Sequence, residues 1–338
     1  MLFPYSITDI MQRNPPPCQV FYSERLTFER TGIFMSDENE RENSQLTPTG
    51  NFTVLLDKVF KNIFNATKKD VTCRRVWEDR QRGINTMVNL ELLKGDLNQL
   101  DKFVFCAALS EYRAGNKTFT IRRLFQKMGG SHELTDEMKK LLIESVERLA
   151  CTRAEINMTA VNDNFHYCDK KEVILKNYLL PCKSVEVKIN GRTVDGAFQI
   201  SDVPPLMEAT ELKKQFADQP TALLAVPKLH NSELVLKLKF FLLERITAII
   251  GSHKKHKPHR VGKTKDGKPI YKRAKRLRKI ITFEDIFVQC DLSDATGRQR
   301  QQARETIAKI LDHFKACKLI SEWHFEKKNG AFYSVHFT

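Results

Sequence analysis

The same order of secondary-structure patterns occurs twice along this chain, and this repetition restricts the fold more than any other feature. Each copy has a long helix, a short strand, a short helix, a second long helix and closing β-strands. The first copy is predicted as Leu97–Tyr112, Thr118–Thr120, Ile121–Met128, a helix after Thr135, and strands Ala154–Val161, Tyr178–Ile189 and Gly196–Ile200. The second is predicted as Ser232–Ile250, Ile280–Thr282, Phe283–Cys290, Thr296–Cys317 and a hairpin within Ile320–Phe337.

This order is that of the winged helix, a helix-turn-helix followed by a β-wing. We therefore predict an α+β fold of two tandem winged-helix domains with a flexible N-terminal extension, and 338 residues suit two domains. The predicted parts are the extension 1–50, a first domain 51–205, a linker helix 206–228 and a second domain 229–338 with a basic insertion 253–279. Apolar residues at helical spacing over Phe52–Phe64 predict that the first domain opens with a helix.

Positive charge is concentrated in one segment. Residues 253–279 hold thirteen Lys or Arg and one acidic residue, and thus +12 of the chain's net charge of +15. Such a run favours a nucleic-acid backbone as partner, although a solvated loop or a nuclear localisation tract has the same composition. Asp266-Gly267 is a typical hairpin tip and predicts a β-arm. The predicted DNA contacts in this run are Lys254, Lys255, Lys257, Arg260, Lys272, Arg273, Lys275 and Arg276.

The helix Thr296–Cys317 has the pattern of a recognition helix. Its apolar stripe of Ala303, Ile307, Ile310, Phe314 and Cys317 predicts a buried side, and its opposite N-terminal surface is rich in Arg and Gln. Arg and Gln pair bidentately with guanine and adenine edges in the major groove, whereas an ordinary polar helix surface is the alternative. The predicted DNA contacts are Arg298, Arg300, Gln301 and Arg304 on the helix, and Lys327 and Lys328 at the wing tip.

The corresponding helix of the first domain has a slightly acidic surface, with Asp136, Glu137, Glu144 and Glu147 among its exposed positions. We therefore expect the second domain to have the stronger role in binding DNA. The first domain then either binds DNA through its β-wing or provides dimer contacts.

No residue pattern predicts catalysis, a bound metal or a cofactor. The Gly262-Lys263-Thr264 tripeptide lacks the first glycine of a phosphate-binding loop, because position 257 is Lys. His253, His256 and His259 recur every three residues, but the lysines around them disfavour a metal site. No Cys-x-x-Cys pair occurs, so the eight cysteines are expected to be reduced and partly buried. We expect no enzyme activity. A nuclease or recombinase is the less favoured alternative.

The chain has no run of about 20 apolar residues, the length that a membrane span requires. Its first residues lack the basic and apolar regions of a secretory signal. We expect a cytoplasmic protein, or a nuclear one, without membrane contact.

In this architecture, with the second domain entered by Ser232–Glu244 and closed by the Arg/Gln-rich helix and wing, the sequence resembles the replication initiators of theta-replicating plasmids and related mobile elements. The resemblance implies sequence-specific binding of double-stranded DNA at repeated origin sites, a homodimeric form, and recruitment of a replicative helicase or its loader. The basic insertion before Ile280 departs from the compact pattern of that family. A winged-helix transcriptional repressor is the alternative.

Overall fold

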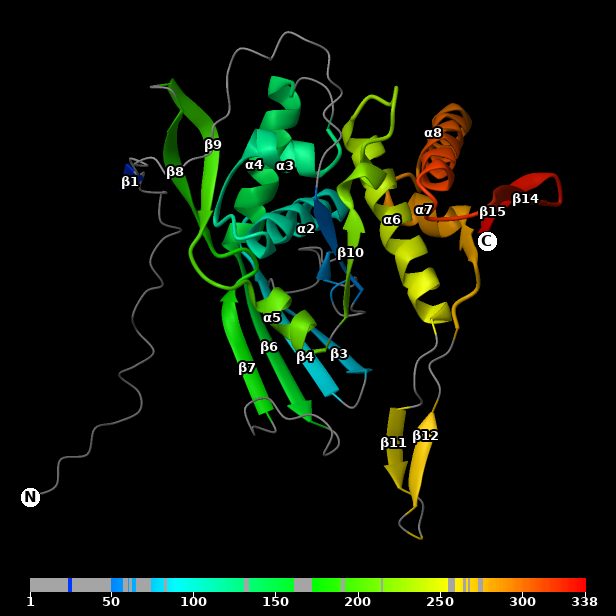
Figure 1. The fold of residues 1–338 in the computed structure, drawn as a ribbon, viewed down its shortest axis with the longest axis horizontal. Helices are drawn as coiled ribbons and strands as arrows, with labels where there is room; N and C mark the ends of the chain where they lie inside the picture. The colour runs from blue at the N-terminus through cyan, green and yellow to red at the C-terminus, as the bar shows by residue number, and fades with distance from the viewer. Residues whose placement is uncertain are drawn as a thin grey trace, which may run out of the picture.

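The computed structural model describes residues 24–25, 50–56, 60, 63–64, 74–81, 84–130, 134–160, 172–189, 192–213, 215–254, 259–263, 266, 268–272 and 276–338. The fold is a mixture of α-helices and small β-sheets, which confirms the predicted mixed class (Figure 1). Of the predicted extension 1–50, the described residues are 24–25, which form β1 (Glu24–Arg25), and Gly50. No helix in these ranges is long and apolar enough to cross a membrane.

The first unit is built around α2 (Gln99–Arg113), which is buried on every side from Gln99 to Glu111. Its N-terminus is closed by a capping box, in which the Asn98 side chain accepts from the Asp101 amide and the Asp101 carboxylate accepts from the Asn98 amide. Asp101 is also buried against Arg148, whose Nη2 lies 2.8 Å from Oδ1 of Asp101. The capping residues therefore connect the start of α2 to a neighbouring helix.

Two helices cross α2 in the order that the sequence predicts. β5 (Thr118–Thr120) leads into α3 (Ile121–Lys127), and α4 (Asp136–Cys151) follows. Thr120 and Thr135 cap the two helices by accepting from backbone amides. Met138, Leu142, Ser145 and Leu149, which recur at helical spacing along α4, are buried, as are Leu124, Phe125 and Met128 around α3.

Two four-stranded sheets flank these helices. One has the order β1-β8-β9-β5, with β8 (Cys182–Ile189) and β9 (Arg192–Ile200). The other is fully antiparallel in the order β3-β4-β6-β7, formed by β3 (Arg74–Gln81), β4 (Ile84–Leu92), β6 (Thr152–Ala160) and β7 (Glu172–Tyr178). β6 and β7 lie between α4 and the β8–β9 hairpin, and they pair with β3 and β4, which precede α2, so this sheet is built from strands outside the repeated order of elements.

The predicted opening helix over Phe52–Phe64 is wrong at its start. Residues 51–55 form β2 (Asn51–Leu55), which pairs antiparallel with β10 (Phe216–Pro220). Four of the five β2 residues are buried. A strand that is buried on both faces has a continuous apolar run, and periodicity alone does not distinguish such a run from part of a buried helix. The strand partner lies about 160 residues away, so local sequence did not reveal it.

The segment 206–228, predicted as a linker helix, contains more than a helix. α5 (Pro205–Leu212) covers only the first part of this range, and β10 and the 3₁₀ turn η2 (Thr221–Leu224) follow it. α5 contacts β6 and β7. This segment therefore packs on the first unit while it leads to the second.

The second unit consists of α6 (Glu233–His253), β13 (Ile280–Thr282), α7 (Phe283–Gln289), α8 (Gly297–Ala316), β14 (Trp323–Lys328) and β15 (Ala331–Phe337). Its sheet has the order β13-β15-β14. The equivalent strands of the first unit lie in the order β5-β9-β8, so both units place the first strand beside the last. The pairings of Trp323 with Phe337 and of Phe325 with Val335 agree with the predicted hairpin.

The two units share one hydrophobic core. α2 contacts α6, and the rings of Phe103 and Phe240 stack with centroids 4.8 Å apart and an interplanar angle of 11°. Phe52 meets both rings edge to face. Since buried apolar area provides most of the free energy of folding, this shared cluster holds the units together.

Candidate nucleic-acid interface

α8 begins at an exposed end and packs by one side only. Thr296 accepts a hydrogen bond from the Gln299 amide, and the Gln299 side chain accepts one from the Thr296 amide at 2.8 Å, a second capping box. The buried side consists of Ala303, Ile307, Ile310, Leu311 and Phe314. Cys317, which was predicted on this stripe, is exposed because the helix ends one residue before it.

Arg298 and Gln301 are exposed on the first two turns of α8. The Nε2 of Gln301 lies 3.2 Å from Oε1 of Glu305, one turn further along the same surface. Arg298 and Gln301 occupy the part of the helix from which a recognition helix contacts base edges. The predicted surface is therefore available where the prediction requires it.

Arg300 lies differently from the other arginines of this helix. It is half-buried, its guanidinium lies 5.4 Å from the centroid of the Phe287 ring on α7, and its Nη2 donates to the Ser293 carbonyl at 2.6 Å. These contacts fix the loop between α7 and α8. In this arrangement Arg300 positions the helix rather than extending into solvent.

Arg304 meets the wing. Its guanidinium lies 4.8 Å from the centroid of the Phe332 ring on β15, and the Nζ of Lys327 on β14 lies 4.7 Å from the same centroid. The Nζ of Lys328 lies 5.4 Å from the centroid of the Tyr333 ring. One aromatic ring thus brings a cation of α8 and a cation of the wing together at a distance favourable for cation–π attraction.

Phe332 and Tyr333 are 39% and 46% exposed, and neither was predicted from the sequence as a site residue. Successive residues of a strand point to opposite faces, so two adjacent aromatic residues in a hairpin cannot both enter one core. The two adjacent aromatic residues were therefore the sequence signal that could have identified an exposed ring on the wing. Its exposed position shows that the wing presents aromatic as well as charged side chains.

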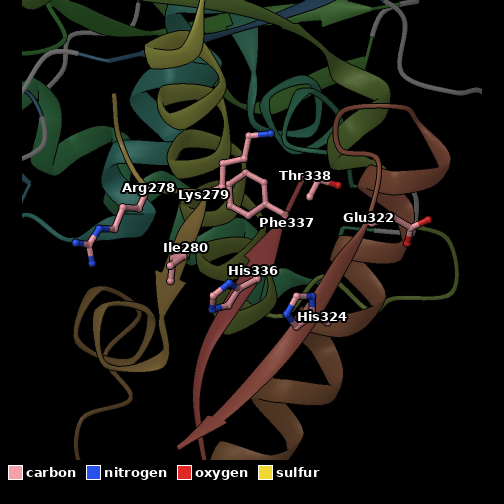
Figure 2. A pocket seen from close by; sticks show the side chains of 8 residues that line it. All are labelled: Arg278, Lys279, Ile280, Glu322, His324, His336, Phe337 and Thr338. Atoms are coloured by element: carbon pink, nitrogen blue, oxygen red, sulfur yellow. The ribbon is translucent and has the colours of Figure 1, made fainter. Parts of the chain in front are cut away.

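The sheet of the second unit has a shallow hollow at its other end, between β13 and the paired ends of β14 and β15. Figure 2 shows His324 and His336 side by side on neighbouring strands, with Arg278 extending away from them. The imidazole rings stack with centroids 5.1 Å apart, and Nε2 of His336 lies 2.7 Å from Oε2 of Glu326. Hydrogen bonding with Ser334 and His336 holds the pKa of the Glu326 carboxyl below its usual value.

The basic insertion contains the predicted β-arm. β11 (His259–Lys263) pairs antiparallel with β12 (Pro269–Lys272), and Asp266 lies in the turn between them. Arg260 and Lys272 belong to these strands, and Lys254 and Arg276 are exposed at the two ends of the insertion. The other predicted contacts of the insertion lie outside the described residues: Lys255, Lys257, Arg273 and Lys275.

In the first unit, two of the basic side chains near α4 are held in ion pairs. Arg148 contacts the buried Asp101, and Lys94 pairs with Glu147. Arg148, in the last turn of α4, is therefore engaged within the first unit. The expectation that the second unit has the stronger DNA role stays a prediction.

Comparisons with known proteins give distant likenesses. No family model and no curated protein matches the chain. Among solved structures, "Crystal structure of the RctB domains 2-3, RctB-155-483" is 9% identical with a TM-score of 0.40 and covers 82% of this chain and 95% of that chain. "Crystal structure of SeMet derivatives of domain2 and domain 3 of RctB" is also 9% identical, with a TM-score of 0.38, and covers 82% of this chain and 96% of that one.

Proposed function

We propose that this protein binds double-stranded DNA sequence-specifically through a winged-helix second unit and thereby initiates replication of a plasmid or mobile element. The observation that carries the proposal is the meeting of α8 and the wing at Phe332, which Arg304 and Lys327 both contact. A helix that enters the major groove and a hairpin that contacts the adjacent backbone must be presented together. The described contacts join them on one surface.

The winged-helix assignment is supported by topology in both units. In each, a helix precedes a short strand, two helices follow, and the closing hairpin returns so that its last strand lies beside the first. Two such units with a shared core support an architecture of two linked DNA contacts at repeated sites.

We further propose that the protein forms homodimers, recruits a replicative helicase or its loader, and itself catalyses no reaction.

The division of roles on α8 follows from its geometry. Arg298 and Gln301, exposed on the first turns, are proposed to contact base edges, while Arg300 holds the preceding loop. Lys327, Lys328 and the basic insertion are proposed to contact phosphates. Base contacts determine sequence preference, and phosphate contacts determine the affinity for every sequence.

The first experiment selects bound fragments from the DNA around the gene and measures affinity for the selected and a scrambled site by fluorescence anisotropy. The double variant Arg298→Ala, Gln301→Ala is expected to lose sequence preference, by about 1–3 kcal/mol for each bidentate contact, with little change for the scrambled site. Arg122→Ala, Gln126→Ala is a matched control, because both residues are exposed on α3 of the first unit. Failure to recover any preferred sequence, or full preference in the α8 variant, would contradict the proposal.

A second experiment tests initiation separately from binding. A marker plasmid that carries the selected sites and the gene is expected to replicate in the host, and purified protein is expected to leave the same supercoiled DNA uncut in the presence of Mg²⁺. Specific binding without replication would support the repressor alternative. Cleavage of the DNA would overturn the non-catalytic assignment.

A further inference from the structure

We propose that the β11–β12 ribbon enters the DNA minor groove beside the site held by α8, and that Ile270 inserts as an apolar wedge at a base step and bends the duplex. This inference rests on the proposed function, because it requires that the second unit bind DNA. It adds a second contact of a different kind, and a deformation of the ligand.

The root of the ribbon is fixed to the end of α6. The Ser252 hydroxyl accepts from the Leu277 amide at 3.0 Å and donates to the Ile249 carbonyl at 2.7 Å. The Nε2 of His253 lies 2.8 Å from the Leu277 carbonyl. Leu277, near the second end of the insertion, is therefore tied to the helix terminus from which the insertion starts, and this gives the ribbon a defined origin.

The ribbon itself is a two-stranded sheet that pairs with no other strand in the described ranges. Such a hairpin is marginally stable in water by itself, so a groove that surrounds it would supply the missing contacts. Figure 1 shows it projecting from the C-terminal end of α6, in a different direction from the β14–β15 wing. DNA held by α8 and the wing would have to follow the surface of the unit for the ribbon to reach its groove.

Ile270 is placed for insertion. It is 42% exposed, and its partner across the ribbon is Gly262, which has no side chain to cover it. The register shifts between Arg260 and Gly262, an irregularity of the kind that increases local twist. Proteins that bend DNA from the minor groove insert Ile, Pro and similar residues between base steps, and Pro269 precedes Ile270 here.

The charge around Ile270 suits the same ligand. The insertion carries a net charge of +12, and Lys254, Lys268 and Arg276 are exposed in it. The backbone phosphates that line a minor groove attract this charge, which would hold the ribbon in place while an apolar side chain enters between bases. Charge alone predicts binding to any DNA, whereas the exposed Ile270 predicts bending.

The test measures fluorescence energy transfer between dyes at the two ends of a fragment that carries the selected site. Full-length protein is expected to bend the fragment by about 20–90° and so to increase transfer. Ile270→Ser is expected to lose most of this increase and to retain specific binding. Ile174→Ser is the matched control, because Ile174 is 48% exposed on β7 of the first unit, and it is expected to bend DNA as the natural protein does.

A variant with residues 259–272 replaced by Gly-Gly shows whether the ribbon uses the minor groove. A polyamide that occupies the minor groove is expected to weaken DNA binding by the natural protein and to leave that of the shortened variant unchanged. Unbent DNA in the natural complex, full bending by Ile270→Ser, or no effect of the polyamide would overturn this inference while the specific binding stands. Absence of any specific binding would instead overturn the proposed function, and this inference with it.

Discussion

The ammonium group of Lys102 on α2 lies 2.6 Å from a carboxylate oxygen of Glu244 on α6, and both side chains are buried between the two units. The Lys102 Nζ also lies 5.2 Å and 5.7 Å from the ring centroids of Phe60 and Phe240. A buried ion pair is costly to form, but it is still more costly to leave one charge without its partner. The pair therefore favours one registry of the two long helices.

Removal of either charge is expected to destabilise the protein strongly. Lys102→Met or Glu244→Leu alone should reduce the free energy of unfolding by about 3–5 kcal/mol, because each leaves the other charge buried. The double variant should lose less than the sum of the two. Urea denaturation of the natural protein, the two single variants and the double variant measures the interaction between the two charges. Additive losses would show that the two charges do not interact.

A side chain at Gly129 is expected to destabilise the protein for two reasons. The φ of Gly129 is +79°, and a Cβ there would lie 2.0 Å from the Leu224 carbonyl oxygen, where the turn after α3 meets η2. Gly115 is a matched control, with φ +89° and nothing within 4 Å. Gly115→Ala should cost about 1 kcal/mol from backbone strain, and Gly129→Ala about 1–3 kcal/mol more from the clash. Equal losses in thermal unfolding would contradict the close approach.

Lys239 is expected to make stability depend on pH near neutrality. It is fully buried in α6, where its Nζ donates to the Asn231 side chain, and burial lowers its pKa to about 7. The unfolded chain keeps this lysine protonated up to its usual pKa near 10.5, so between these values the unfolded state binds more protons and stability rises with pH.

From pH 7 to pH 9 this contribution amounts to about 2 kcal/mol. Lys239→Met should remove this part of the slope, whatever its effect on absolute stability. The measurement is the free energy of unfolding in urea at both pH values. An unchanged slope in the variant would show that another group is responsible.

Phe332 is expected to support DNA binding by positioning cations. Phe332→Leu keeps an apolar side chain on the wing but removes the ring that Arg304 and Lys327 contact. Two exposed cation–π contacts at about 0.5–1 kcal/mol each set an upper limit of roughly 5- to 30-fold on the expected loss of affinity. Tyr333→Leu affects only Lys328 and should cost less. Anisotropy titrations with the selected site compare them, and equal losses would contradict the shared role of Phe332.

Local sequence determined the helices and short strands of both units. The boundaries of α3, α4, α7 and α8 follow from caps such as Thr120, Thr135, Thr282 and Thr296, and the apolar stripes follow from helical periodicity. The Asp266-Gly267 turn also predicted the β-arm of the insertion. These are properties of residues close together in the chain.

Tertiary structure decided what depends on distant partners. β2 is a strand because β10 pairs with it, Arg300 is held by Phe287 and Ser293, and Cys317 is exposed because α8 ends before it. The junction of the units, with Lys102 against Glu244 and Phe103 on Phe240, joins residues more than 130 positions apart. Periodicity shows which side of an element is apolar, but the partner that covers this side is selected by packing of the whole chain.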